Sequence, residues 1–227
     1  MFIPIKDDNP HRTYPVVNTL LILTNVIVFL YQLTLTPHQY QAFVLANATI
    51  PSHIRVALTG HGNLEAALVP IFTSMFLHSG FLHIAGNMLF LWIFGDNVED
   101  YFGHFTYLLF YLACGIGSGM AHVIFNYHSG LPALGASGAI SGVMGAYIIL
   151  YPRARVLTLV FIFFIPIPAF IILGYWFLLQ FLEGVATVGT NITGGVAVWA
   201  HIGGFIMGML ITLVSLGDRK QYANYSQ

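Results

Sequence analysis

Long apolar runs alternate with short polar segments along this chain of 227 residues. A helix of about 20 predominantly apolar residues is long enough to cross a bilayer. On this criterion the pattern predicts six membrane-spanning helices, at about 16–36, 81–99, 104–126, 136–151, 168–184 and 195–216. We therefore expect an all-α membrane protein that forms a single membrane domain over residues 1–227.

Three segments lie outside this pattern. Residues 37–80 mix apolar residues with prolines, glycines and charges, so we expect an interfacial, partly folded loop on the outer side of the membrane. Residues 156–165 are apolar but short, and Pro166 and Pro168 follow, so this stretch either extends the fifth span or lies along the membrane interface. Residues 1–16 are polar, and the apolar run after them is longer than the core of a signal peptide, which favours an uncleaved first span.

The positions of the seven cationic side chains predict the orientation of the spans. If the N-terminus lies in the cytoplasm, six of the seven fall in cytoplasmic segments, namely Lys6, Arg12, Arg153, Arg155, Arg219 and Lys220. Only Arg55 falls on the outer side. The positive-inside rule predicts this asymmetry for six spans with both termini in the cytoplasm. Five or seven spans would scatter the cations over both sides.

The composition agrees with a membrane protein. Hydrophobic residues make up 57% of the chain and charged residues 7%, against roughly 25% charged residues in soluble domains. The net charge of −1 gives no electrostatic basis for binding nucleic acid. The single cysteine, Cys114, excludes an intrachain disulfide. We therefore expect the lipid bilayer, and no nucleic acid, as a partner.

Four polar side chains lie inside the apolar runs, where a hydroxyl or an imidazole is costly to bury. Ser137 opens the fourth predicted span and His201 lies in the sixth, while His83 and Asn87 lie near the start of the second. These three spans all run from outside to inside. The four side chains therefore share one depth, within about two turns of the outer helix ends. Packing the three ends together would bring them into one cavity.

These side chains fit the parts of a serine hydrolase. A serine hydroxyl attacks a carbonyl only when a base removes its proton, and histidine suits that role near neutral pH. Ser137 is thus the candidate nucleophile and His201 the candidate base. His83 and Asn87, spaced i, i+4 on one helix face, can donate hydrogen bonds to a developing oxyanion. The backbone N–H of Ser137 can add a third donor, because the first N–H groups of a helix lack intrahelical partners.

A third catalytic member is not evident. Of the eight acidic residues, only Glu65 and Glu183 fall on the outer side, and neither lies within a span near His201. We therefore predict a Ser–His dyad, with Glu183 a weak candidate for a third member.

Each of these residues also has a plainer explanation. A serine in a membrane helix commonly hydrogen-bonds to its own backbone, and a buried histidine can be structural or part of a proton path. His78 and His83 are candidate metal ligands, but no HExxH pattern accompanies them and their i, i+5 spacing is poor for one metal, so we expect none. Two Gly-xxx-Gly patterns, at 138–142 and 204–208, by themselves indicate only close helix packing. A catalytic site is favoured because all four polar residues lie at one depth on three different spans.

The motifs resemble those of the rhomboid family of intramembrane serine proteases. The matching stretches, in the family's order, are His78-Ser-Gly-Phe-Leu-His83-Ile-Ala-Gly-Asn87, Gly135-Ala-Ser137-Gly138 and Ala200-His201-x-x-Gly204. The N-terminal Ile-Pro-Ile-Lys-Asp-Asp-Asn-Pro is also similar to bacterial members, and the resemblance covers nearly the whole chain. It implies a six-helix rhomboid fold in the bacterial cytoplasmic membrane.

The resemblance also implies an activity, the hydrolysis of peptide bonds in single-span membrane proteins near the outer membrane face, without a metal or organic cofactor. Ser137 would be the nucleophile, His201 the general base, and His83, Asn87 and the Ser137 backbone N–H the oxyanion hole. Four further residues would support them, namely His78, Gly135, Gly138 and Gly204. An intact helix hides its carbonyls in hydrogen bonds, so we expect substrates whose helix unwinds easily.

Two positions depart from the family pattern. Many members carry a Trp-Arg pair in the first outer loop, where this chain has Val69 and Pro70. Many have an aromatic ring four residues after the nucleophile, where this chain has Ser141, so the support of His201 is expected to differ.

Two other functions stay open at this point. One is a non-catalytic rhomboid-like protein that binds membrane helices, which the intact pair of Ser137 and His201 disfavours. The other is a small transporter with His201 in a proton path, which the lack of an acidic residue in the core of any predicted span disfavours.

Overall fold

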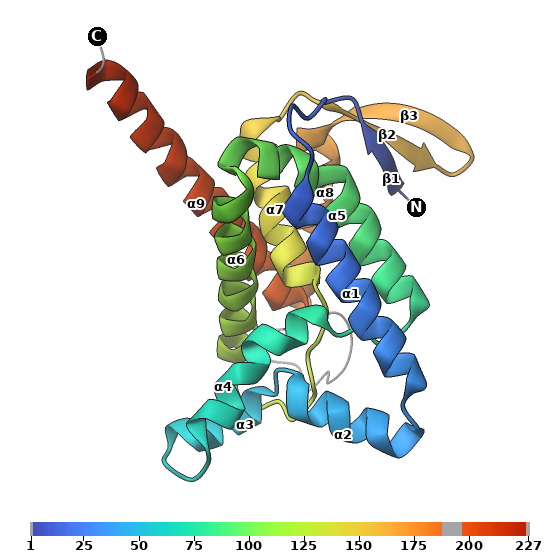
Figure 1. Cartoon of the computed structure of the whole chain (residues 1–227), viewed down its shortest axis with the longest axis vertical. Coiled ribbons are helices and arrows are strands. Elements are labelled where there is room, and N and C mark those ends of the chain that lie inside the picture. Colours follow the sequence, from blue (N-terminus) through green and yellow to red (C-terminus); the bar gives the residue numbers. More distant parts are fainter. Residues whose placement is uncertain (1, 188–196, 226–227) are drawn as a thin grey trace.

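Six long helices occupy the positions of the six apolar runs (Figure 1). The computed structural model describes residues 2–187 and 197–225. Within them the long helices are α1 (Val16–Thr34), α5 (Phe81–Phe102), α6 (His104–Phe125), α7 (Ser137–Leu150), α8 (Ala169–Thr187) and α9 (Val198–Tyr225). The expected helix starts agree with these to within three residues, and α9 runs beyond its expected end at 216.

Four of these helices, α1, α6, α8 and α9, are long and apolar enough to cross a membrane. A fifth crossing counts if Leu64–Phe76 and α5, which meet at an angle of 77°, form one bent span. Helix α7 is apolar but shorter, with 14 residues. The part of the chain that the structure describes is therefore mostly helical and has four to five candidate spans, as in a multi-pass membrane protein.

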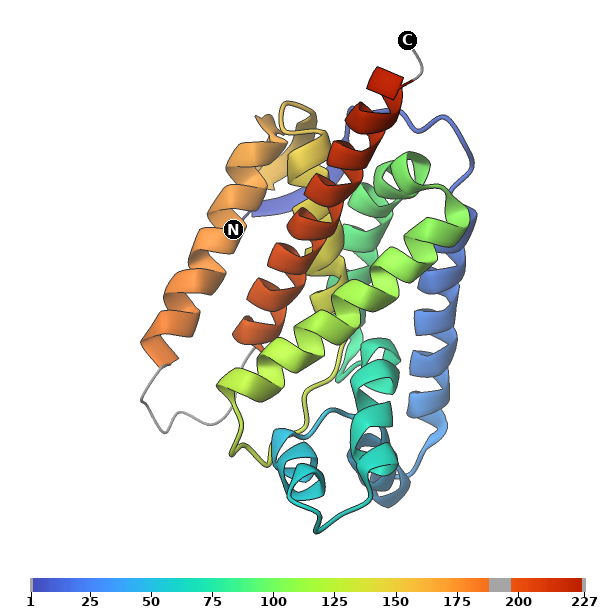
Figure 2. The same cartoon turned by 90° about the vertical axis from the view of Figure 1, so that its left-hand side faces the viewer.

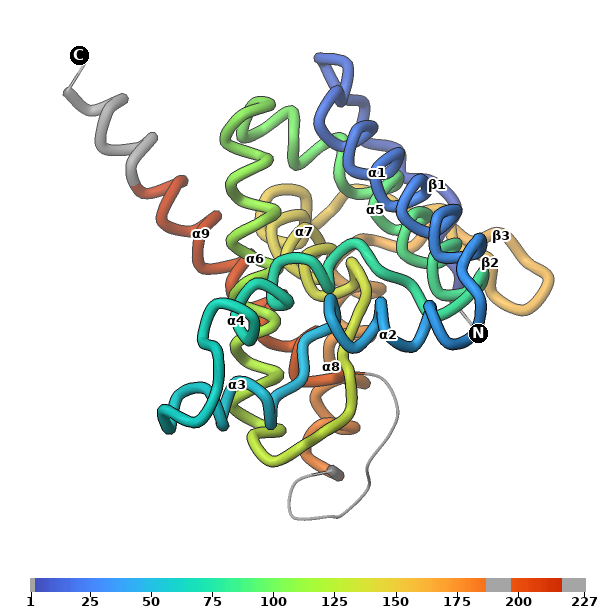
Figure 3. The backbone as a smooth tube through the Cα atoms, turned by 60° about the horizontal axis from the view of Figure 1, so that its bottom comes forward, coloured from blue at the N-terminus to red at the C-terminus, as the bar shows by residue number. Residues whose placement is uncertain are grey.

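The segment expected to form an interfacial loop folds into short helices. These are α2 (Pro37–Asn47), α3 (Pro51–Leu58), α4 (Leu64–Thr73) and the 3-10 turn η1 (Ser74–Phe76). Thr36 starts α2 with a capping box, in which its hydroxyl accepts from the Gln39 N–H while the Gln39 side chain accepts from the Thr36 N–H. Proline stands at the start of α2 and α3, where its missing N–H is not needed. Figure 3 shows these helices lying across one end of the long ones.

A three-stranded antiparallel sheet lies at the opposite end of the bundle (Figure 1). Its strands are β1 (Phe2–Asp7), β2 (Arg155–Val160) and β3 (Phe163–Pro168), in the order β1-β2-β3. The prediction of an all-α protein is therefore wrong at this end. Residues 156–165 form most of the β2–β3 hairpin and do not extend α8.

The sheet escaped prediction because its strands come from distant parts of the chain. Ile3 in β1 pairs with Leu159 in β2, a contact that no local pattern reveals. A hairpin alone is marginal in stability, and the third strand makes the sheet viable. Pro166 and Pro168 are tolerated because β3 is an edge strand, which needs fewer N–H donors.

Carboxylates fasten the segment after β1 to the C-terminal end of α5. Asp100 accepts a hydrogen bond from the Thr13 backbone N–H at 3.0 Å. Glu99, which is 1% exposed, accepts from the backbone N–H groups of Val17 at 2.9 Å and Asn18 at 2.7 Å. These N–H groups belong to the first turn of α1, where they lack intrahelical partners and favour a negative charge. Both acids thus have a structural task at this end of α5.

Helix α7 lies in the middle of the bundle (Figures 1 and 2), and every residue at 138–147 is buried. Its packing against α9 reaches backbone contact. A methyl group on Gly204 would lie 2.0 Å from the carbonyl oxygen of Gly138, and one on Gly208 would lie 1.9 Å from that of Gly142. The expectation that the two Gly-xxx-Gly patterns let these helices approach closely is confirmed.

Candidate active site

Ser137 is the first residue of α7, and the backbone just before it requires glycine. Gly135 has a φ of +128°, a conformation that L residues rarely adopt. Its N–H donates to the carbonyl of Ser74 at 2.9 Å, which fixes the turn. The turn leads directly into the helix, so the Ser137 N–H is one of those without an intrahelical partner.

The Ser137 hydroxyl contacts the imidazole of His201, which lies in the first turn of α9. Ser137 Oγ and His201 Nε2 are 2.8 Å apart. The His201 side chain is largely shielded, since the residue is 8% exposed. The structure therefore brings the two residues together, and the glycine contact between α7 and α9 is what allows it.

The second ring nitrogen of His201 fixes the position of the ring proton. Nδ1 lies 2.6 Å from Oε1 of Gln180. An amide oxygen can only accept a hydrogen bond, so Nδ1 carries the proton. Nε2 then presents its lone pair to Ser137, whose hydroxyl donates. This is the state that a general base needs.

His83 and Asn87 lie one turn apart on α5 and face Gly135. A methyl group on Gly135 would lie 2.7 Å from His83 Nε2 and 3.7 Å from Asn87 Nδ2. His83 Nδ1 lies 3.0 Å from the Ser79 hydroxyl and 3.5 Å from the Ser79 backbone nitrogen, and Nε2 is the ring nitrogen that faces Gly135. Asn87 Nδ2 is buried and has no hydrogen-bond partner among the described residues. His83 Nε2 and the Asn87 amide nitrogen therefore both face the turn that leads into Ser137.

His78 is buried beside His83. Its backbone N–H donates to Gln32 Oε1 and its carbonyl accepts from Gln32 Nε2, both at 3.0 Å, which holds it against α1. Its ring lies edge-on to the ring of His83, with 5.1 Å between the centroids. Within residues 2–187 and 197–225, no three His, Cys, Asp or Glu side chains converge as metal ligands would.

Two residues of α8 that the sequence did not single out complete the surroundings of His201. Gln180 bonds its Nδ1, and the ring of Trp176 lies 5.7 Å from the imidazole, centroid to centroid. Glu183, the weak candidate for this place, has an exposed side chain, and Nδ1 bonds Gln180 instead. The third member was expected among the acidic residues, and the side chain of Gln180 is a neutral amide. The i, i+4 spacing of Trp176 and Gln180 puts both on one face of α8, but the spacing does not tell toward which helix that face points.

Ser141 occupies the position where the family resemblance suggests an aromatic ring. Its hydroxyl donates back to the carbonyl of Ser137 at 2.6 Å, and the residue is fully buried within the bundle. The aromatic ring near His201 comes from Trp176 on α8 instead.

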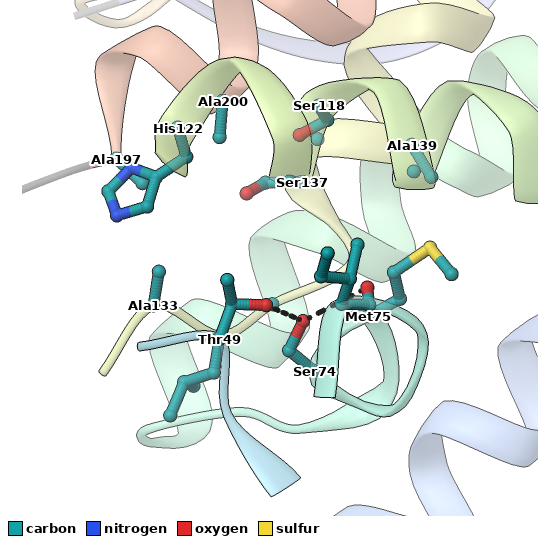
Figure 4. A pocket seen from close by; sticks show the side chains of 16 residues that line it. Thr49, Ser74, Met75, Ser118, His122, Ala133, Ser137, Ala139, Ala197 and Ala200 are labelled. Carbon is teal, nitrogen blue, oxygen red and sulfur yellow. Dashed lines mark hydrogen bonds between the residues drawn. The ribbon is translucent and has the colours of Figure 1, made fainter. Parts of the chain in front are cut away.

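A cavity of about 40 Å³ opens beside Ser137 (Figure 4). Its polar lining includes Thr49, Ser74, Ser118 and His122, and the hydroxyls of Thr49 and Ser74 are 2.9 Å apart. A polar cavity of this size has room for water.

Sequence comparison relates the chain to known proteins. Residues 65–217 match the family profile described as the rhomboid domain. The chain is 34% identical over 152 residues to "Rhomboid protein 1, mitochondrial" of Saccharomyces cerevisiae, covering 63% of this chain and 40% of the yeast protein. It is 36% identical over 126 residues to "Rhomboid protease GluP" of Bacillus subtilis, covering 55% of this chain and 24% of that protein. It thus spans less than half of the length of either relative.

Proposed function

Because the chain belongs to the rhomboid family, we propose that it is an intramembrane serine endopeptidase with Ser137 as the nucleophile and His201 as the general base. The observation that carries this proposal is the 2.8 Å contact between Ser137 Oγ and His201 Nε2, and the Gln180 oxygen 2.6 Å from Nδ1 supports it. The Bacillus relative is named a rhomboid protease, which supports the same class of activity.

The reaction begins when Ser137 Oγ attacks the carbonyl carbon of the scissile peptide bond while its proton passes to His201 Nε2. The carbonyl oxygen becomes the oxyanion of a tetrahedral intermediate. Collapse of this intermediate breaks the C–N bond, and His201 gives its proton to the leaving amine. The acyl group then remains on Ser137 as an ester. A water molecule, deprotonated by His201, attacks this ester. The carboxylic acid leaves, and His201 returns the proton to Ser137 Oγ.

The oxyanion needs donors that are in place before the reaction starts. We assign this task to His83 Nε2–H, Asn87 Nδ2–H and the Ser137 backbone N–H. The buried, unpartnered amide of Asn87 supports the assignment, since an unsatisfied buried donor is costly unless a ligand uses it.

The orientation in the membrane follows from the cations. We propose six spans with both termini in the cytoplasm, so that the sheet with Lys6 and Arg155 faces the cytoplasm. Helix α7 counts as a span although its 14 residues extend only about 21 Å, because α5, α6 and α9 pack around it. In this orientation α2, α3 and α4 lie on the outer side.

The site then lies near the outer face, because its residues belong to the first two turns of α5, α7 and α9. Single-span proteins of a bacterial cytoplasmic membrane are the proposed substrates. A substrate helix must unwind locally to expose a carbonyl, so helix-breaking residues near the outer face favour cleavage.

Labelling with a fluorophosphonate probe tests the proposed function. The probe reacts with a serine hydroxyl only when a base activates it, so we expect one labelled site, Ser137, identified by mass spectrometry of the purified protein. The label should disappear in His201→Ala while that variant keeps its thermal unfolding temperature. An unlabelled but folded wild-type protein would instead support the non-catalytic, helix-binding alternative.

Asn87→Ala is expected to lower kcat by about 10²–10³-fold with little change in KM, because one oxyanion donor is lost in the transition state. Cleavage of a reconstituted single-span substrate measures both constants. Asn47→Ala is the matched control, since among the described residues the side-chain amide of Asn47 donates only to the Phe43 carbonyl within α2. Unchanged kcat in Asn87→Ala would remove this residue from the oxyanion site.

A further inference from the structure

Gln180 on α8 bonds the nitrogen of His201 that faces away from Ser137. We propose that Gln180 is a positioning residue, which holds His201 in the one tautomer that can accept the Ser137 proton. This inference rests on the proposed function of Ser137 and His201. It replaces the expected dyad with a chain of three side chains, the third of them uncharged.

The two hydrogen bonds of the ring depend on each other. A neutral imidazole carries one proton, and the contacts of 2.6 Å at Nδ1 and 2.8 Å at Nε2 occupy both nitrogens. With the proton on Nε2, the bare Nδ1 would face the lone pairs of the Gln180 oxygen, and Nε2 could no longer take a proton from Ser137. An acceptor at Nδ1 therefore selects the state that is competent as a base.

No carboxylate competes with Gln180 for this place among the described residues. Their histidine–carboxylate ion pairs join His11 to Asp96 and His104 to Glu99, and His201 has none. Glu183, one turn further along α8, is exposed. The amide oxygen is thus the acceptor that the fold supplies to Nδ1.

A neutral acceptor suits a buried site. His201 is 8% exposed and Gln180 is half-buried, so a carboxylate in the place of Gln180 would lose part of its hydration. Removing an ionised carboxylate from water costs several kcal/mol in proteins, whereas a hydrogen-bonded amide avoids this penalty. The amide also stabilises the protonated imidazole less than a carboxylate would. Gln180 therefore sets the tautomer and the direction of the ring without adding a buried charge.

Trp176 fixes the plane of the same ring. It lies one turn before Gln180 on α8, with its ring 5.7 Å from the imidazole and tilted by 38°. One helix thus supplies both a hydrogen bond to the ring edge and an aromatic contact. Trp176 thus supplies the aromatic contact to His201 that an aromatic residue at position 141 would give.

The tautomer can be measured without any activity, in the inactive background Ser137→Ala. Protonated and bare ring nitrogens have well-separated ¹⁵N chemical shifts, and the His201 signals are identified by their absence in His201→Ala. With Gln180 present, we expect a protonated Nδ1 and a bare Nε2. With Gln180→Leu added, we expect the proton to move to Nε2 in a large share of molecules. A protonated Nδ1 that persists in Gln180→Leu would overturn the proposal.

Kinetics of single-span substrate cleavage in the active protein give the second measurement. Gln180→Leu is expected to lower kcat on the order of 10²-fold with little change in KM, since a wrong tautomer removes much of the general-base contribution. Gln180→Glu keeps an acceptor at Nδ1 and is expected to retain most of the wild-type kcat. Glu183→Gln is the matched control on the next turn of α8 and should behave as wild type.

The outcomes separate this proposal from the one on which it rests. If Ser137→Ala still cleaves substrate, the proposed function is refuted. The proposed role of Gln180 depends on it and is then refuted as well. If Ser137→Ala is inactive but Gln180→Leu keeps the wild-type kcat, only the role of Gln180 is refuted. Equal losses of kcat and of thermal stability in Gln180→Leu and Gln180→Glu would mean a packing role, which also refutes it.

Discussion

Ser137→Ala is expected to lower kcat for peptide-bond cleavage by on the order of 10⁶-fold, the loss seen when the nucleophile of a serine protease is removed. Without the hydroxyl no acyl-enzyme can form, and His201 Nε2 has no proton to accept from the chain. The measurement is cleavage of a purified single-span substrate in liposomes, with the new termini identified by mass spectrometry. The variant should keep its fold, because Ser137 Oγ bonds only one described partner, His201.

Ser141→Ala is the matched control for this substitution. It removes the same kind of group one turn further along α7, where the hydroxyl donates to the Ser137 backbone carbonyl at 2.6 Å. We expect kcat to stay close to the wild-type value. Cleavage by Ser137→Ala at the wild-type rate would exclude the proposed mechanism, whatever the control shows.

Gly204→Ala is expected to lower both thermal stability and activity. The added methyl group would lie 2.0 Å from the carbonyl oxygen of Gly138, so α9 must move away from α7. Overpacking of this kind typically costs about 1–3 kcal/mol of unfolding free energy. The same shift separates Ser137 Oγ from His201 Nε2, and a displacement of about 1 Å at a reacting group can lower the rate about 10²-fold. Thermal unfolding in lipid nanodiscs and the cleavage assay measure the two effects.

Gly217→Ala provides the comparison on the same helix. A methyl group there meets no atom within 4 Å. Alanine is a better helix former than glycine by about 1 kcal/mol, so the unfolding temperature should stay the same or rise. If Gly204→Ala and Gly217→Ala unfold at the same temperature, the close approach of α7 and α9 is not needed for the stability of the protein.

The helices could be predicted from the sequence because each apolar run is long and its ends are marked by polar residues or glycine. The meeting of Ser137, His201, His83 and Asn87 followed from one further step, the common depth that the cation distribution assigns to three parallel spans. Long-range information of this kind comes from topology. It needs no knowledge of side-chain contacts.

The sheet and Gln180 could not be predicted by the same route. The partner of β1 lies in a hairpin that reads locally as a short apolar stretch, and pairing across such a distance leaves no periodic signal. Gln180 carries no charge, and its task depends on the rotation of α8 about its own axis, which places Trp176 and Gln180 toward His201. An apolar helix with little difference between its faces does not reveal that rotation.

The pairing of β1 with β2 also sets an order of events during synthesis. Ile3 and Leu159 are partners, so the ribosome must add 156 residues after Ile3 before the partner of this residue exists. At roughly 5–20 residues per second this takes about 8–30 s. Throughout that interval β1 has no strand to pair with, while α1, α5, α6 and α7 are already made. Closure of the sheet is therefore a late step, and protection of the β1 amides from hydrogen exchange would report when β1 has paired with the β2–β3 hairpin.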